Sequence, residues 1–195
     1  MTVGLKAIET RYKGYRMRSR LEARWAVFFD ALGIAWDYEK EGFEIEKVGR
    51  YLPDFWLPNL RLWVEVKPDR TPFDSDAYRK AHGLMWDSGY PVFITEGVPS
   101  LAATGQGLGY DMSDSGGGVS GVEDVAWAVC RSCNGVTVTF GDDGHLAMCG
   151  DWEAWRGSDC CDQERNWDTR HTKLSRAVDA ARSARFEHGE SGATR

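Results

Sequence analysis

Glu65 and Lys67 are two positions apart in the apolar run 62–67 (LWVEVK), which predicts a strand. Side chains along a strand alternate between its two faces, so Trp63, Glu65 and Lys67 share one face. A carboxylate and an ammonium group therefore lie about 7 Å apart along that face, because each residue adds about 3.3 Å. Such a pair suits chemistry on a phosphate, where the carboxylate can hold a divalent cation and the ammonium can stabilise negative charge.

A second carboxylate, Asp54, lies in the strand-like run 51–57. The Pro-Asn pair at 58–59 predicts a turn, and a hairpin that closes there brings Asp54 beside Glu65. Hard Mg²⁺ or Mn²⁺ prefers carboxylate oxygens and keeps water molecules for a substrate phosphate. A bound metal also lowers the pKa of an attacking water, and Lys67 can orient that water or stabilise the transition state. The grouping favours metal-dependent hydrolysis of a phosphodiester.

A third carboxylate, Glu22, belongs to a helix predicted over residues 18–33. Ser19 can cap this helix and Glu22, three residues on, completes a capping box, while Gly33 ends it. Glu22 borders the apolar face of the helix, so it can reach the sheet and help to hold a metal. Two other interpretations stay open. Glu22 can be a capping residue only, and Asp54 with Glu65 and Lys67 can be a solvated strand face with a cross-strand ion pair.

Four motifs occur in order: RSRLE at 18–22, LGIAWDYE at 32–39, YLPDFWLP at 51–58 and VEVK at 64–67. Together they resemble the PD-(D/E)XK nucleases, and among these the phage junction-resolving and very-short-patch-repair-like endonucleases, over about residues 15–96. The resemblance implies a restriction-endonuclease-like mixed β-sheet flanked by helices. Carried over by position, it implies that Glu22, Asp54 and Glu65 bind Mg²⁺ (or Mn²⁺) and that Lys67 assists catalysis.

The remaining pattern agrees with an α/β fold. Residues 35–45 form a strand-like run, Asp74 can cap a helix that extends to about residue 88, and YPVFIT at 90–95 reads as a buried strand. Ala77, Ala81, Leu84 and Met85 form the expected buried stripe of that second helix. The order of helix, three strands, helix and strand is typical of a mixed sheet covered by helices.

The formal net charge of −6 argues against a general affinity for nucleic acid, but the basic residues are unevenly distributed. Residues 1–17 read as a basic N-terminal arm, and a local basic segment can bind phosphates even in an acidic protein. The expected DNA-binding residues are Lys13, Arg16, Arg18 and Arg20. The alternative is a solvated tail and helix face.

Composition divides the chain after the nuclease domain, which we place at 18–98. Residues 99–122 are rich in Gly and Ser and read as a flexible linker. Residues 123–195 hold every cysteine and a C-terminal helix predicted over 173–186. The odd number of cysteines and the expected cytosolic setting favour metal ligation over disulfides.

The cysteines predict a zinc-ribbon-like module. C-x₂-C at Cys130 and Cys133 is typical of a zinc knuckle, and a hairpin over 136–149 would return Cys149 to it. Cys160 or Cys161 can complete four ligands out of the five cysteines. A structural Zn²⁺ would then help to fold a small module. The other interpretation is a set of free buried thiols.

The sequence as a whole therefore predicts a cytoplasmic, Mg²⁺-dependent DNA endonuclease, acting in the host cytoplasm if it is phage-encoded. Branched, mismatched and nicked DNA all remain candidate substrates, and a homodimer is one option for its assembly. The N-terminus has no apolar signal-peptide core and no run of 18 apolar residues predicts a membrane span. A different class of function is a non-catalytic nucleic-acid-binding or assembly protein on a degenerate nuclease scaffold.

Overall fold

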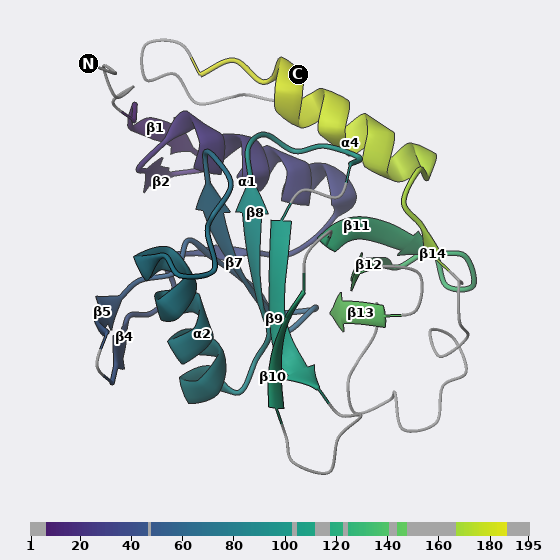
Figure 1. The fold of residues 1–195 in the computed structure, drawn as a ribbon. Coiled ribbons are helices and arrows are strands. Elements are labelled where there is room, and N and C mark those ends of the chain that lie inside the picture. The colour runs from purple at the N-terminus through teal and green to yellow at the C-terminus, as the bar shows by residue number, and fades with distance from the viewer. Residues whose placement is uncertain are drawn as a thin grey trace.

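A mixed sheet runs through the middle of the molecule (Figure 1). The computed structural model describes residues 7–46, 48–102, 105–111, 118–122, 125–140, 144–147 and 167–186. In spatial order the strands of this sheet are β10 (Gly118–Val122), β9 (Gly105–Asp111), β8 (Val92–Glu96), β7 (Leu62–Lys67), β6 (Phe55–Leu57) and β3 (Asp37–Tyr38). Strands β7 and β8 pair in parallel, and the other neighbours pair antiparallel. The expected mixed α/β class is confirmed at this level.

Helix α1 (Arg20–Leu32) covers one face of the sheet. The Ser19 hydroxyl accepts a hydrogen bond from the Glu22 N–H at 3.1 Å, and Gly33 ends the helix with a left-handed φ of 72°. Both predicted boundaries are confirmed, because a polar cap and a glycine satisfy the groups that a helix end leaves unpaired. Phe28 and Phe29 are fully buried in the core on this side.

Helix α2 (Asp76–Ser88) covers the opposite face, where Ala81, Leu84 and Met85 are buried as expected and Ala77 is half-buried. Its cap is Ser75 and not Asp74, since the Ser75 hydroxyl accepts from the Tyr78 N–H at 3.1 Å. The helix also packs on a small hairpin of β4 (Phe43–Ile45) and β5 (Gly49–Tyr51).

The strand-like runs 35–45 and 51–57 are each divided between two sheets. Residues of the first run form β3 and β4, and residues of the second run form β5 and β6. The breaks fall at Glu39, which has a positive φ of 46°, and around Pro53, which has no N–H to donate to a ladder. The expected strand at 90–95 begins two residues later, at Val92.

Residues 10–17 are a hairpin and not a free arm. Strands β1 (Thr10–Tyr12) and β2 (Tyr15–Met17) pair antiparallel across a turn at Lys13 and Gly14, whose φ values of 48° and 86° match the primed turns of tight hairpins. Tyr12 and Met17 are buried in the same core as α1, and this burial explains why the segment folds.

The C-terminal part packs on the same core. A second sheet has the order β13 (Gly144–Ala147), β12 (Val136–Phe140), β11 (Val125–Cys130) and β14 (Trp167–Asp168). Helix α4 (Thr172–Ser183) lies along α1 (Figure 1), and Arg24 of α1 donates to the carbonyl of Ala181 at 2.7 Å. The C-terminal helix was predicted over 173–186, and it ends earlier, at Ser183. Phe186, beyond its end, is still buried.

Two expectations about domain organisation are corrected by this packing. The segment 99–122 was expected to be a linker, yet it supplies β9 and β10 to the central sheet. A strand can be rich in glycine where another backbone approaches closely, and a Cβ on Gly105 would lie 2.5 Å from the Ile94 carbonyl oxygen. The described part of 123–195 shares one hydrophobic core with α1, so it does not stand as a separate module. Within the described residues, no helix is long and apolar enough to cross a membrane.

Gly83→Ala tests the contact between α2 and the β4–β5 hairpin. A Cβ on Gly83 would lie 2.1 Å from Cγ2 of Ile45, so one of the two elements must shift. We expect the free energy of unfolding in urea to fall by about 1–3 kcal/mol from overpacking, although alanine is the better helix former. Adding Ile45→Ala removes the clashing methyl group, so the double variant should lose less than the sum of the single losses. A more stable Gly83→Ala protein would contradict this packing.

Candidate active site

Asp54, which directly precedes β6, lies beside Glu65 of β7. Phe55 pairs with Val64, so one more step of the same register sets Asp54 opposite Glu65. The two residues are 3% and 5% exposed. The Glu65 carboxylate accepts from the Tyr51 hydroxyl at 2.7 Å and from the Lys67 ammonium group. Burial rules out a solvated strand face, and the expected convergence of two carboxylates and a lysine is present.

The face assignment along β7 also agrees with the predicted alternation. Trp63 packs with the α2 side of the sheet, in the cluster that holds Leu84 and Met85. Val64 and Val66 pack in the other cluster, on the α1 side. Glu65 has the parity of Trp63, so its side chain leaves the strand on the α2 side.

The Asp54 carboxylate is the centre of the cluster. Its Oδ2 accepts from the Val66 N–H at 2.7 Å and its Oδ1 accepts from the Arg18 guanidinium. Burial raises the pKa of Asp54 well above the usual aspartate value, and the negative charges of Glu65 and Glu22 raise it further. The Val66 N–H and Arg18 lower the pKa of Asp54, and they oppose this rise without cancelling it.

Glu22 is both a capping residue and a member of this cluster. Its Oε1 accepts from the Ser19 hydroxyl at 2.7 Å, and its Oε2 accepts from the Tyr38 hydroxyl at 2.5 Å and from the Arg18 N–H at 3.0 Å. Glu22 is 7% exposed and its charge acts on Asp54. The interpretation of Glu22 as only a cap is therefore incomplete.

Arg18 is the counter-ion of the site. Its guanidinium binds Asp54 and also Glu39, at 2.9 Å from Nε to Oε1. The sequence suggested Arg18 as a DNA contact, whereas here it binds the buried Asp54 and the half-buried Glu39. Its side chain remains 53% exposed, so it can move into solvent without unfolding its surroundings. Nothing in the local sequence pattern distinguishes this arginine from its neighbours.

Two tyrosines complete the site and were not found from the sequence. Tyr51 donates to Glu65, and Tyr38 donates to Glu22. Burial raises the pKa of both phenols, and the neighbouring carboxylates add to the rise. Both tyrosines therefore stay protonated at neutral pH and act as donors that fix the carboxylates. The sequence feature that could have identified these tyrosines is their place inside the motifs WDYE and YLPD.

A divalent cation fits the charge of this cluster but not its present arrangement. The buried carboxyl groups of Glu22, Asp54 and Glu65, together with the half-buried Glu39, share two cations, Arg18 and Lys67. Oxygen ligands of this type suit Mg²⁺ or Mn²⁺. In the part of the chain that the structure describes, no group of three Asp, Glu, His or Cys side chains is arranged to hold a metal ion. Arg18 would have to leave Asp54 before a metal bound.

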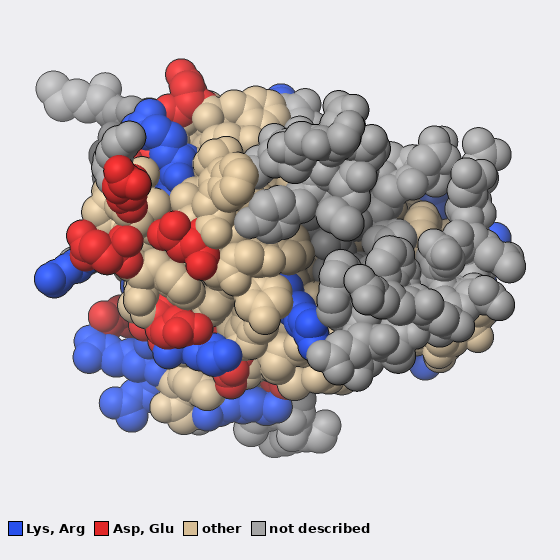
Figure 2. Space-filling model, turned by 90° about the horizontal axis from the view of Figure 1, so that it is seen from below, with Lys and Arg blue, Asp and Glu red and all other residues tan. Residues whose placement is uncertain are grey.

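Two of the other three expected basic residues are paired with carboxylates. Lys13 pairs with Asp30 at 2.8 Å and Arg16 pairs with Glu9, while Arg20 is exposed. Figure 2 shows the molecule from below, where basic and acidic side chains both occur on the described part of that face. Contact of these residues with DNA stays a prediction.

Of the five cysteines in the predicted zinc site, the structure describes Cys130 and Cys133, the C-x₂-C pair. Cys130 is buried at the end of β11 and Cys133 is exposed. The connecting turn is tight, since the Asn134 N–H donates to the Cys130 carbonyl at 2.9 Å and the Gly135 N–H donates to Cys133 Sγ at 3.4 Å. Cys149, Cys160 and Cys161 lie outside the described residues, so the predicted zinc site stays a prediction.

No protein-family model, no curated protein and no solved structure matches this chain. The site must therefore be interpreted from its own residues.

Proposed function

We propose that this protein is a divalent-metal-dependent endonuclease that hydrolyses phosphodiester bonds in DNA. The observation that carries the proposal is the burial of three carboxylates, Glu22, Asp54 and Glu65, with the pKa of Asp54 raised by burial and by the charges of the other two. A purely structural role does not require three like charges to be brought together, and such clusters are typical of functional sites. The resemblance to PD-(D/E)XK nucleases rests on the same residues.

In this proposal each residue has a separate task. Glu22, Asp54 and Glu65 would hold Mg²⁺ or Mn²⁺, which when bound supplies an acidified water and positive charge for the phosphate. Tyr38 and Tyr51 orient two of these carboxylates through their hydroxyl groups. Lys67, on the same strand as Glu65, would place its ammonium group next to the phosphate and stabilise negative charge there. Arg18, once released from Asp54, would be free to bind a phosphate oxygen.

Zn²⁺ bound by four of the five cysteines would be a structural addition and take no part in hydrolysis, because thiolates are poor ligands for Mg²⁺. Cys130 and Cys133 would supply the first two ligands. The proposed enzyme acts in the cytoplasm, and a homodimer is one option for its assembly.

One observation favours the second candidate, a DNA-binding protein without catalysis on the same scaffold. Arg18 already neutralises Asp54, so the cluster can persist without a metal. Binding of linear, nicked, mismatched and branched DNA that needs no metal, and that never leads to cleavage, would favour this candidate.

Lys67→Met tests the catalytic proposal, because methionine keeps the length of the side chain and removes its charge. We expect cleavage of a panel of linear, nicked, mismatched and branched DNA in Mg²⁺ to fall by about a hundred-fold to a thousand-fold, as for other losses of a charge-stabilising donor. Lys80→Met is the matched control. Both side chains are 30% exposed and both bind a carboxylate, but Lys80 pairs with Asp76 on α2. Equal activity of the two variants would exclude Lys67 from the reaction.

A further inference from the structure

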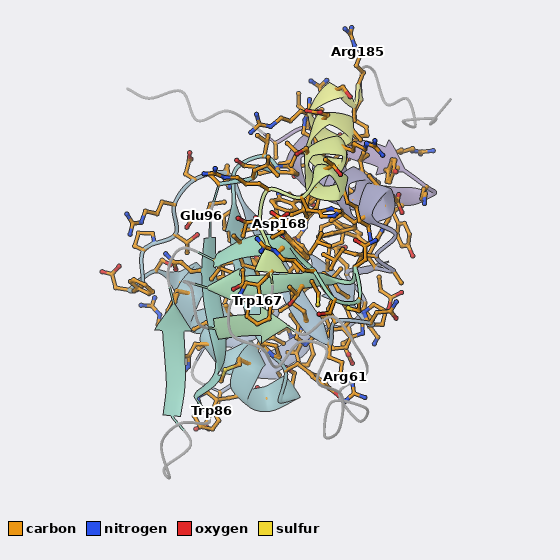
Figure 3. The ribbon with its side chains drawn as sticks, turned by 90° about the vertical axis from the view of Figure 1, so that its right-hand side faces the viewer. Arg61, Trp86, Glu96, Trp167, Asp168 and Arg185 are labelled. Carbon is orange, nitrogen blue, oxygen red and sulfur yellow. The ribbon has the colours of Figure 1, made fainter. Side chains whose placement is uncertain are left out.

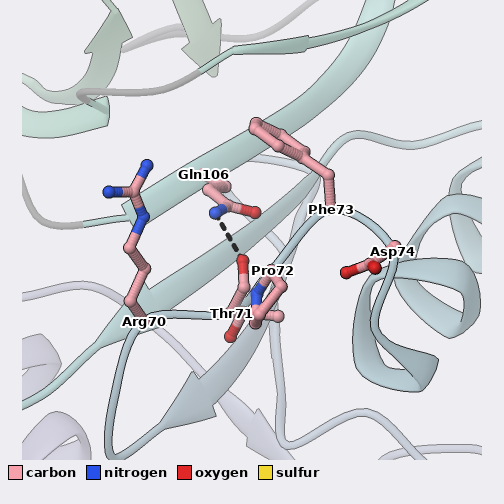
Figure 4. A pocket seen from close by; sticks show the side chains of 6 residues that line it. All are labelled: Arg70, Thr71, Pro72, Phe73, Asp74 and Gln106. Carbon is pink, nitrogen blue, oxygen red and sulfur yellow. Dashed lines mark hydrogen bonds between the residues drawn. The ribbon is translucent and has the colours of Figure 1, made fainter.

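A pocket of about 470 Å³ opens where the loop from β7 to α2 passes over β9 (Figure 4). It is lined by Arg70, Thr71, Pro72, Phe73, Asp74 and Gln106. The loop is held in place by β8, since the Thr71 N–H donates to the Glu96 carboxylate at 2.6 Å. None of these residues belongs to the carboxylate cluster.

Gln106 supplies the pocket with an unpaired acceptor. It is 3% exposed, and its Nε2 donates to the Thr71 carbonyl at 2.6 Å. A carbonyl oxygen can only accept, so the amide nitrogen must face Thr71 and the oxygen must face away from it (Figure 4). Within the described residues Oε1 has no hydrogen-bond partner. A buried acceptor without a partner is costly, so a ligand that offers an N–H at this point would gain a full hydrogen bond.

The pocket lies on the same sheet face as the carboxylate cluster. Glu65 pairs with Ile94 on β8, and Ile94 pairs with Gln106 on β9, so the three side chains form one row across the sheet. Two strand spacings separate Glu65 from Gln106, which is about 10 Å. A strand of DNA whose phosphate lay at Glu65 could therefore place a nearby base at Gln106.

The other lining residues suit a flat, polar ring. Phe73 is 44% exposed, and Tyr78 packs against it at 5.0 Å between ring centroids, nearly perpendicular. An exposed aromatic ring can stack on a nucleobase, and such stacking tolerates any base. Arg70 and Asp74 add a cation and a carboxylate to the exposed part of the lining. Stacking on Phe73 combined with the Gln106 acceptor would favour a base that presents an N–H donor at this point.

We propose that this pocket binds one base of the DNA strand that the carboxylate cluster acts on, and that it prefers bases with an exocyclic amino group. Cytosine offers its 4-amino group to Gln106 Oε1, whereas uracil has a carbonyl oxygen at the same position. This inference rests on the proposed function for the identity of the strand, but the base preference can be measured without any cleavage.

The test is fluorescence anisotropy of labelled, short oligodeoxycytidine and oligodeoxyuridine in EDTA, where the metal-dependent reaction is absent. The wild-type protein should bind the cytidine oligomer about ten-fold more tightly. Gln106→Leu should remove that preference. Phe73 is exposed, so Phe73→Ala should leave the fold intact. This variant should bind both oligomers about ten-fold more weakly, because stacking on the ring is lost.

Trp86→Ala is the control for the loss of an exposed aromatic side chain. Trp86 is 50% exposed, and Figure 3 shows it well apart from Glu96, which holds the pocket loop. This variant should bind like the wild type. Equal affinity of the wild type for both oligomers, or unchanged binding by Phe73→Ala, would overturn the pocket proposal even if Mg²⁺-dependent cleavage were observed. A base preference in a protein that never cleaves DNA would support the pocket and reject the nuclease.

Discussion

Asp54→Asn is expected to abolish Mg²⁺-dependent cleavage of DNA while the protein stays folded. Asparagine keeps an oxygen that can accept from the Val66 N–H, now 2.7 Å from the carboxylate. It removes the negative charge that Mg²⁺ requires, and the loss of one member of a catalytic unit commonly lowers the rate about a thousand-fold or more. The measurement is cleavage rate in Mg²⁺, with circular dichroism to check folding. Cleavage that survives in this variant would reject the site.

Asp30→Asn is the matched control for that substitution. Asp30 is a half-buried aspartate of α1 that also accepts side-chain hydrogen bonds, from Tyr12 at 2.6 Å and from Lys13 at 2.8 Å. It lies outside the carboxylate cluster, so cleavage should persist. Stabilisation of the fold by Mg²⁺ is a second measurement, and it does not depend on cleavage activity. Mg²⁺ should stabilise the wild type by about 2.7 kcal/mol at a hundred times its Kd and should not stabilise Asp54→Asn.

The pH dependence of the free energy of unfolding compares the wild type with Asp54→Asn independently of cleavage. The pKa of Asp54 is raised in the folded state, mainly by burial and then by Glu65 and Glu22. At pH values between the usual aspartate pKa and the raised pKa, Asp54 is deprotonated in the unfolded chain and protonated in the folded chain. The contribution of Asp54 to stability is thus complete at lower pH and is lost as pH rises through the raised pKa. Without metal, Asp54→Asn should lack this decline, and Mg²⁺ should bind better as pH rises.

Trp127→Ala is expected to lower the free energy of unfolding by about 3–5 kcal/mol, which is the usual cost of deleting a large buried aromatic side chain. Trp127 on β11 is 5% exposed and lies 5.5 Å from Phe28, 5.7 Å from Phe29 and 5.8 Å from Phe93, between ring centroids. These partners belong to α1 and β8, so the substitution should weaken the packing of the N-terminal part as well as that of the C-terminal part. Urea unfolding followed by fluorescence and by circular dichroism should give one coincident transition.

Two further variants sharpen this test. Trp86→Ala, at a 50% exposed position, should change stability by no more than about 0.5 kcal/mol. Trp127→Phe keeps an aromatic ring and removes an indole N–H that has no hydrogen-bond partner among the described residues, so it should cost less than alanine. Two separate transitions in Trp127→Ala, with residues 18–98 intact, would instead support independent domains.

The local structure of the site was decided by the sequence. Ser19 and Gly33 delimit α1, and the Pro-Asn turn joins β6 to β7. Alternation along β7 sets Glu65 on the face of Trp63. Caps, turns and strand alternation depend on a few neighbouring residues, so they can be predicted locally. This local information was enough to bring Asp54 next to Glu65.

Long-range packing decided the rest. Arg18 and the two tyrosines became partners of the carboxylates only when the chain around β2, β3 and β5 was brought to the sheet. The segment 99–122 was misread because its glycines resemble a linker, whereas pairing with β8 makes it a strand. Cross-strand pairing and a shared core join residues far apart in the chain, and no local pattern contains that information.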